Sequence, residues 1–162
     1  MSPMPEQKPG RSKQDYGTPP ELIKAVKHRL GIDHFELDIA ADKDNTVAER
    51  FYTEEDDALS ILCPWSTWGQ RGRWAWLNPP FGNIAPWVEK ATMEARIGAH
   101  IMMLVPTSHS NWWVKWVAPY AYVTHLHGRI TFLGCDTPYP KDCSLLMYTP
   151  WAMTGSEIWS WK

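Results

Sequence analysis

Four consecutive residues, Asn-Pro-Pro-Phe at positions 78–81, have the side chains best suited to chemistry. An apolar run at 74–77 leads into them, so we expect them to follow a buried strand directly. The two prolines fix φ, remove two N–H donors and favour an extended Asn78. The amide of Asn78, backbone carbonyls without neighbouring N–H donors and the ring of Phe81 would then project from a rigid turn. Such a set of groups suits the binding of a planar group that carries an NH₂. A proline-rich turn with a packed phenylalanine is the alternative that these residues leave open.

Alternating strand and helix patterns surround this turn and would position it. The run from Thr18 to Glu21 is typical of a helix start, with a capping hydroxyl, a proline in the first turn and an acid at the positive end. Apolar residues at helical spacing follow, and Gly31 is a typical helix end. We expect further helices at 86–97 and 111–117, and strands at 35–39, 50–53, 74–77, 101–105, 122–126, 129–133 and 145–148.

This alternation predicts an α/β fold with a mostly parallel sheet flanked by helices. The wholly apolar run at 101–105 is typical of a central strand buried on both faces. The last strands are close enough in sequence to form an antiparallel hairpin at the edge of the sheet. Right-handed crossovers would bring the loops at 38–44, 78–81 and 106–113 to one edge, as an α/β ligand site requires.

The composition of the 162-residue chain is that of one soluble globular domain, which we place at 14–162 after a polar tail at 1–13. The net charge of −2 argues against binding to nucleic acid by bulk electrostatics alone, although 42–57 is acidic and 58–135 is basic. The three cysteines lack metal-ligand spacing, so no metal site is expected. Because no apolar run reaches membrane-spanning length, we expect a cytoplasmic protein.

Five stretches of the chain resemble the phage-type DNA N-6-adenine methyltransferases (Dam-like), a family within the S-adenosylmethionine-dependent amino-methyltransferases. The resemblance implies a Rossmann-like class I methyltransferase fold. It also implies S-adenosylmethionine as the cofactor and the exocyclic N6 amine of adenine in double-stranded DNA as the methyl acceptor. The stretches lie in the family's order at 14–21, 37–42, 51–59, 76–84 and 128–133.

The resemblance implies cofactor contacts from three segments. Asp38 would meet the ammonium or a bound water of the methionine part, and Ala40 is small enough for close approach of the backbone. Asp57 would accept a hydrogen bond from the cofactor's adenine amine, with Asp56 as the rival. A loop acid bonded to its own backbone, or a solvated acidic loop, is the alternative for these carboxylates. The residues that would pack on the cofactor from the N-terminal side are Tyr16, Thr18 and Pro19.

The resemblance also implies how the turn at 78–81 would act. The side chain of Asn78 and the carbonyl of Pro79 would accept the two hydrogens of the target amine, with Pro80 in the rigid corner and Phe81 stacked on the purine. A target base must flip out of the duplex to reach them. The side chains expected to line that path or to hold phosphate are His109, Trp112, Trp113 and Arg129, although tryptophans also suit core packing.

The chain departs from the wider methyltransferase pattern in two ways. The loop after the first strand lacks the usual Gly-x-Gly, and there is no room for a substantial target-recognition domain. Recognition would then come from short loops at 65–73 or 135–143, or from a second subunit in a homodimer. Two alternatives stay open: methylation of an RNA adenine or a protein glutamine, and a catalytically silent DNA-binding or anti-restriction relative.

Overall fold

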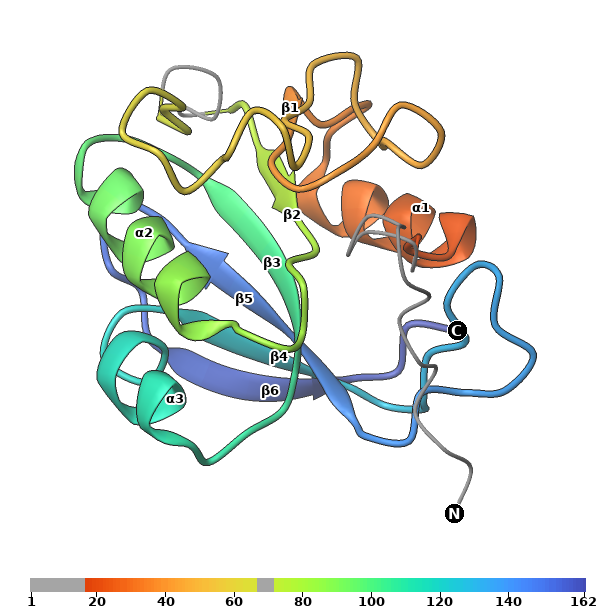
Figure 1. Ribbon diagram of the computed structural model, residues 1–162. Helices are drawn as coiled ribbons and strands as arrows, with labels where there is room; N and C mark the ends of the chain where they lie inside the picture. The colour runs from red at the N-terminus through yellow and green to blue at the C-terminus, as the bar shows by residue number, and fades with distance from the viewer. Residues whose placement is uncertain (1–16, 67–71) are drawn as a thin grey trace.

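A six-stranded sheet lies between α1 on one face and α2 and α3 on the other in the computed structural model, which describes residues 17–66 and 72–162 (Figure 1). The predicted α/β class is confirmed. Within this described part, the helices are too short or too polar to cross a bilayer. The elements are α1 (Pro20–Leu30), β1 (Leu37–Asp38), β2 (Ala75–Leu77), α2 (Ala85–Arg96), β3 (Ile101–Pro106), α3 (Asn111–Trp116), β4 (Tyr122–Leu126), β5 (Cys143–Tyr148) and β6 (Gly155–Trp159).

The strand order is β1-β2-β3-β5-β4-β6, and β5 runs against the other five strands. The sheet is therefore partly antiparallel. Because β1, β2 and β3 are parallel neighbours, their carboxyl ends meet at one edge of the sheet. Asp38, Asn78 and Thr107 stand at or directly after these three ends, so the loops that follow them begin at the same edge, as the sequence predicts.

Alternate residues of the central strands pack into two apolar layers, one on each face of the sheet. On β3, Met103 packs in the layer that contains Val88 of α2, and Leu104 packs in the layer that contains Leu22 of α1. All six residues of β3 are buried, which confirms the predicted strand with two covered faces. This two-sided core fixes the positions of the strand ends from which the candidate site residues project.

Helix α1 begins where the sequence predicts, but its first turn is not capped as expected. Pro20 and Glu21 occupy the first turn, the N-cap residue is Pro19, and no side chain caps the helix. The predicted capping role of Thr18 is therefore wrong, because its Oγ1 instead accepts a hydrogen bond from Asn78. The predicted end at Gly31 is confirmed, and its φ of 69° is a conformation that glycine adopts readily.

Three predicted strands are shorter than expected or absent. The strand at 35–39 is reduced to β1, and the segment at 50–53 forms an isolated bridge to β1 at Phe51. No strand forms at 129–133, where Leu133 makes an isolated bridge to Gly17. Ile130 and Phe132 are buried, whereas Leu133 is exposed, so this segment has the alternating pattern typical of a strand. The segment is nevertheless not paired along its length with a strand of the described residues.

The predicted hairpin does not lie at the edge of the sheet. Strands β4 and β5 are antiparallel neighbours, but β5 lies inside the sheet between β3 and β4. The edge position belongs to β6, which the sequence did not predict. Most residues of β6 are exposed, so this strand lacks the apolar pattern that identifies a buried strand.

Candidate active site

Asn78 stands at the carboxyl end of β2 and is 8% exposed. Its Nδ2 donates a hydrogen bond to Oγ1 of Thr18 at 3.1 Å, which joins two predicted site residues across 60 positions of sequence. In the structure the nitrogen end of the amide faces Thr18, so the oxygen end, which can only accept, points the other way. Pro19 and Pro79, the next residues along the chain, are also buried, and Pro80 is half-buried.

Phe81 lies half-buried at the end of the same turn, against two other aromatic rings. Its centroid is 5.8 Å from that of Phe132 and 5.4 Å from that of Tyr139, and all three pairs in this trio meet at steep angles. Burial raises the pKa of Tyr139 to about 12, so its hydroxyl keeps its proton at neutral pH. The predicted recognition loop at 135–143 thus contacts the turn through Tyr139. No pattern in the sequence connected this tyrosine with Phe81.

Asp38 ends β1 and is 3% exposed. Its Oδ2 accepts a hydrogen bond from the backbone N–H of Val47 at 3.0 Å, whereas Oδ1 is buried without a hydrogen-bond partner among the described residues. Burial raises the pKa of this carboxyl from 3.8 to about 7, although the N–H groups of Val47 and the half-buried Ala40 act in the opposite direction. A buried oxygen with an open acceptor position suits a cationic or N–H-bearing ligand.

The two candidate acids at 56 and 57 differ in what they already bind. Oδ2 of Asp56 accepts hydrogen bonds from the backbone N and Oγ1 of Thr53, at 2.7 and 3.0 Å, and so closes a local turn. Asp57 is exposed, and its carboxylate makes no hydrogen bond or ion pair within the part of the chain that the structure describes. Its φ of 53° is unusual for a residue other than glycine. Asp57 is therefore the better-placed acceptor for a ligand.

Two side chains of α2 hold the loop that carries Asp57. Oε2 of Glu94 accepts hydrogen bonds from two successive backbone N–H groups, beginning with that of Trp65, at 3.0 and 2.8 Å. Nζ of Lys90 donates to three backbone carbonyls that lie 27 to 32 positions earlier in the chain. The sequence did not identify Lys90 or Glu94, because their partners are distant backbone atoms. The three carbonyls are those of Ala58, Ser60 and Cys63, at 2.8, 2.7 and 2.8 Å.

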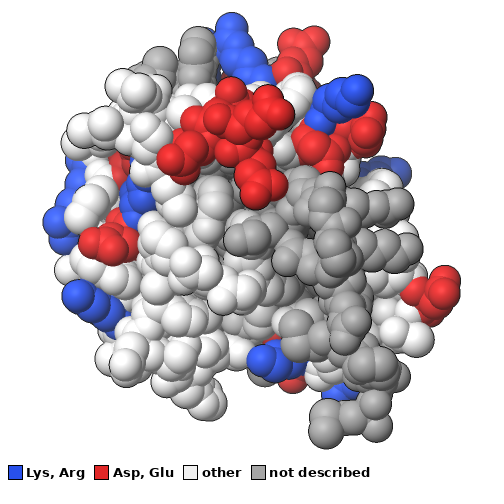
Figure 2. Space-filling view, viewed as in Figure 1, with Lys and Arg blue, Asp and Glu red and all other residues white. Residues whose placement is uncertain are grey.

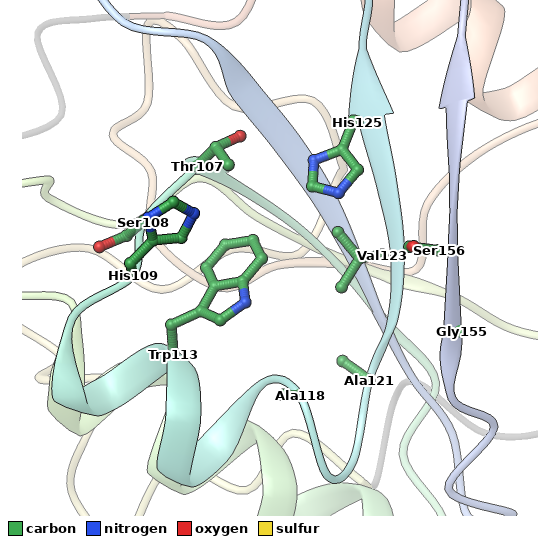
Figure 3. Close-up of a pocket in the computed structure, with 10 residues that line it drawn as sticks. All are labelled: Thr107, Ser108, His109, Trp113, Ala118, Ala121, Val123, His125, Gly155 and Ser156. Carbon is green, nitrogen blue, oxygen red and sulfur yellow. The ribbon is translucent and has the colours of Figure 1, made fainter.

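The predicted substrate residues occupy two separate places. His109, on the loop after β3, and Trp113, on α3, line a cavity of about 330 Å³ (Figure 3). Trp112 is half-buried, with its ring centroid 5.6 Å from that of Trp113. Arg129 is exposed on the segment after β4 and does not line this cavity. Tyr16 lies outside the described residues.

Acidic side chains gather at the top of the visible face, over the loops near β1, whereas basic side chains are scattered (Figure 2). The exposed acids at 54–57 belong to these loops. Lys90, one of the basic residues of the 58–135 region, is committed to loop carbonyls, and burial lowers its pKa. The surroundings of Asp57 therefore suit a small cation or a hydroxyl-bearing ligand better than a phosphate. The described ranges contain no group of three or more His, Cys, Asp or Glu side chains arranged to hold a metal ion.

Comparison with known proteins identifies similar chains. A family model described as DNA N-6-adenine-methyltransferase (Dam) matches residues 6–150. The DNA N-6-adenine-methyltransferase of Escherichia phage T1 is 33% identical over 98 residues, which are 60% of this chain and 38% of that protein. The DNA N-6-adenine-methyltransferase of Haemophilus phage HP1 (strain HP1c1) is 29% identical over 132 residues, which are 75% of this chain and 71% of that protein. The match thus spans well under half of the phage T1 protein.

Replacing Lys90 by Met should release the loop at 54–66. The variant keeps most of the apolar stem but removes the ammonium from three carbonyls. The carbonyl of Ala58 keeps the Nε1–H of Trp65 and that of Ser60 keeps the N–H of Cys63. The free energy of unfolding should therefore fall by about 3 kcal/mol, and amide hydrogen exchange across the loop should rise. Lys24→Met, at an exposed position of α1, is the matched control and should change neither quantity. Unchanged exchange in the Lys90→Met loop would show that these contacts do not hold it.

The raised pKa of Asp38 should make stability depend on pH. The folded state keeps a proton that the unfolded chain loses above about pH 4, so the free energy of unfolding should decrease as pH rises from about 4 to about 7. The decrease should be on the order of 4 kcal/mol and should level off at higher pH. Asp38→Asn cannot ionise and should lack this component. Urea unfolding of both proteins across this pH range measures the difference, and parallel curves would contradict the raised pKa.

Proposed function

The chain belongs to the DNA N-6-adenine-methyltransferase (Dam) family, and on this premise we propose that it transfers a methyl group from S-adenosylmethionine to the exocyclic N6 amine of adenine in double-stranded DNA. The observation that carries the proposal is the side chain of Asn78, whose nitrogen is bonded to Thr18 at the carboxyl end of β2. An amide held in this way can offer its oxygen to an amine N–H. The names of the two phage relatives support the same methyl acceptor.

The proposed role of the turn at 78–81 is to activate a weakly nucleophilic amine. Conjugation draws the lone pair of an exocyclic amine into the purine ring. Oδ1 of Asn78 and the carbonyl oxygen of Pro79 would accept the two amine hydrogens and turn them out of the ring plane, which frees the lone pair for attack. Pro80 would keep the turn rigid, and Phe81, supported by two neighbouring rings, would stack on the purine.

The acidic residues at the sheet edge fit S-adenosylmethionine. When bound, the cofactor supplies a methyl group on a sulfonium, which is a good leaving group. The buried Oδ1 of Asp38, without a partner among the described residues, would accept a hydrogen bond from the ammonium of the methionine part. The exposed carboxylate of Asp57 would accept one from the adenine amine, and Ala40 would allow the backbone to approach. The residues proposed to pack on the cofactor from the N-terminal side are Tyr16, Thr18 and Pro19.

We further infer a Rossmann-like class I methyltransferase fold for a single domain at 14–162. Support comes from the five strands that run in one direction, from the reversed strand β5 inside the sheet and from helices on both faces. Asp38 ends β1 and Asn78 directly follows β2, its parallel neighbour, as a ligand site at the edge of an α/β sheet requires.

An adenine inside a duplex must flip out to reach the turn. His109 and Trp113 would line its path, and Arg129 would hold a backbone phosphate. The loop at 135–143 contacts Phe81 through Tyr139, which favours this loop as the part that meets the bases. In a homodimer, the second subunit would add contacts to the duplex.

Replacing Asn78 by Ala should remove methyl transfer while cofactor binding stays within about twofold. Without the amide acceptor, transfer of labelled methyl from S-adenosylmethionine to unmethylated DNA should fall at least about 100-fold. Asn83→Ala, exposed just beyond the same turn, is the matched control and should keep the wild-type rate. Wild-type label found only on RNA or protein would support another substrate. Cofactor binding without transfer to any substrate would support a silent relative.

Replacing Asp57 by Gly should weaken cofactor binding selectively. Glycine adopts a φ of 53° without strain, so this variant removes the carboxylate and keeps the loop conformation. Loss of a hydrogen bond to a charged group should raise the cofactor Kd by roughly tenfold or more, with DNA affinity nearly unchanged. Asp56→Ala should reduce stability more than cofactor affinity, because it opens the local turn at Thr53. Calorimetry measures the affinity for the cofactor, and fluorescence anisotropy measures the affinity for DNA. If Asp57→Gly lowers both affinities equally, Asp57 is not a specific cofactor contact.

A further inference from the structure

The cavity lined by Trp113 lies between α3, β4 and β6 and shares no lining residue with the turn at 78–81. Its volume of about 330 Å³ is that of a small-molecule pocket. Figure 3 shows His109 and Trp113 on one side and His125, on β4, across from them. The lining contains no Asp, Glu, Lys or Arg, so it suits a ligand portion without a formal charge. We name it the Trp113 cavity.

A chain of three hydrogen-bonding side chains lies at one end of the Trp113 cavity. Oγ of the fully buried Ser144 is 2.5 Å from Oγ1 of Thr107 and 2.9 Å from Nδ1 of His125. With a neutral imidazole, the three groups hold three protons, and two of these are used within the chain. When Thr107 donates to Ser144 and Ser144 donates to Nδ1 of His125, the groups left for a ligand are a lone pair of Thr107 and the Nε2–H of His125. When Nδ1–H of His125 donates to Ser144 and Ser144 donates to Thr107, the groups left are the O–H of Thr107 and the lone pair on Nε2.

These two arrangements always leave one donor and one acceptor at the ends of the chain. Both end residues, Thr107 and His125, line the Trp113 cavity. The ring of Trp113 adds a flat surface, with its centroid 6.4 Å from that of His125 and the ring planes 16° apart. The cavity therefore offers a planar, uncharged ligand a flat ring together with one donor and one acceptor.

We propose that the Trp113 cavity binds an unpaired nucleobase of the DNA substrate, other than the adenine held at the turn at 78–81. This inference rests on the proposed function. Every natural base is planar and presents both donors and acceptors. Because the three hydrogen-bonding side chains can reverse the direction of their bonds, the free donor can lie at either end of the chain to suit the base. Since β2 and β3 are parallel neighbours, the loop that begins at Thr107 leaves the same sheet edge as the turn, so the Thr107 end of the cavity lies at the edge proposed to meet the DNA.

The test compares two short probes that differ only in their bases. A fluorescein-labelled five-residue thymidine oligonucleotide is titrated into the cofactor-free protein beside an abasic oligomer with the same phosphates. Thymine is used because the turn is proposed to hold adenine. The thymidine oligomer should bind at least about fivefold more tightly than the abasic one, and its addition should shift the ring NMR signals of His125. Equal binding of the two oligomers would overturn the proposal.

Variants test whether the Trp113 cavity causes the difference in affinity between the two oligomers. Trp113→Ala should remove the preference for the thymidine oligomer, and Trp113→Phe, which keeps a flat ring, should retain most of it. Trp151→Ala, which removes an exposed indole outside the cavity, is the matched control and should bind as wild type does. A preference that survives Trp113→Ala, or His125 signals that do not shift, would place the base elsewhere and overturn the proposal.

Because neither probe requires methyl transfer, the two hypotheses can fail separately. A protein that methylates DNA but binds both oligomers equally would refute the base site and leave the proposed function intact. A protein that prefers thymidine through Trp113 but transfers no methyl group to DNA would refute the proposed function and retain the base site.

Discussion

The hydrogen bond between Asn78 and Thr18 is the contact on which the candidate site depends. It joins the start of α1 to the end of β2 and occupies the hydroxyl that would otherwise be able to cap the helix. A buried amide needs partners, and this bond satisfies one donor while it sets the direction of the oxygen. The two prolines that follow remove further donors from the turn, so acceptor groups predominate there. One tertiary contact and two prolines thus determine the local chemistry.

Helix α2 connects this turn to the loop that carries Asp57. The helix begins at Ala85, shortly after Phe81, and its side chains Lys90 and Glu94 bind backbone groups of the loop. The turn proposed to hold the amine and the acid proposed to hold the cofactor are therefore attached to the same helix. Fixed relative positions of two bound groups are what a positional mechanism of transfer requires. Asp57, with its left-handed backbone, directly precedes Ala58, whose carbonyl accepts a hydrogen bond from Lys90.

Features with local causes could be predicted from the sequence, and features with distant causes could not. The end of α1 at Gly31 and the buried strand β3 follow from one residue and one apolar run. The cap at Thr18 was wrong because a residue 60 positions away competes for the hydroxyl. Lys90 was missed because its carbonyl partners belong to a separate loop. For Asn78 and Asp38, residue type and family resemblance suggested roles, and the structure adds their hydrogen bonds and burial.

The proposed cofactor contact at Asp38 comes with a cost in stability. A buried carboxyl oxygen without a hydrogen-bond partner among the described residues lowers stability, and the hydrogen bond from Val47 to Oδ2 offsets part of that cost. With a pKa of about 7, the group is divided near neutral pH between a protonated form and an ionised form that suits a cation. An ammonium at Oδ1 would favour the ionised form, so binding would release a proton and strengthen as pH rises toward 7.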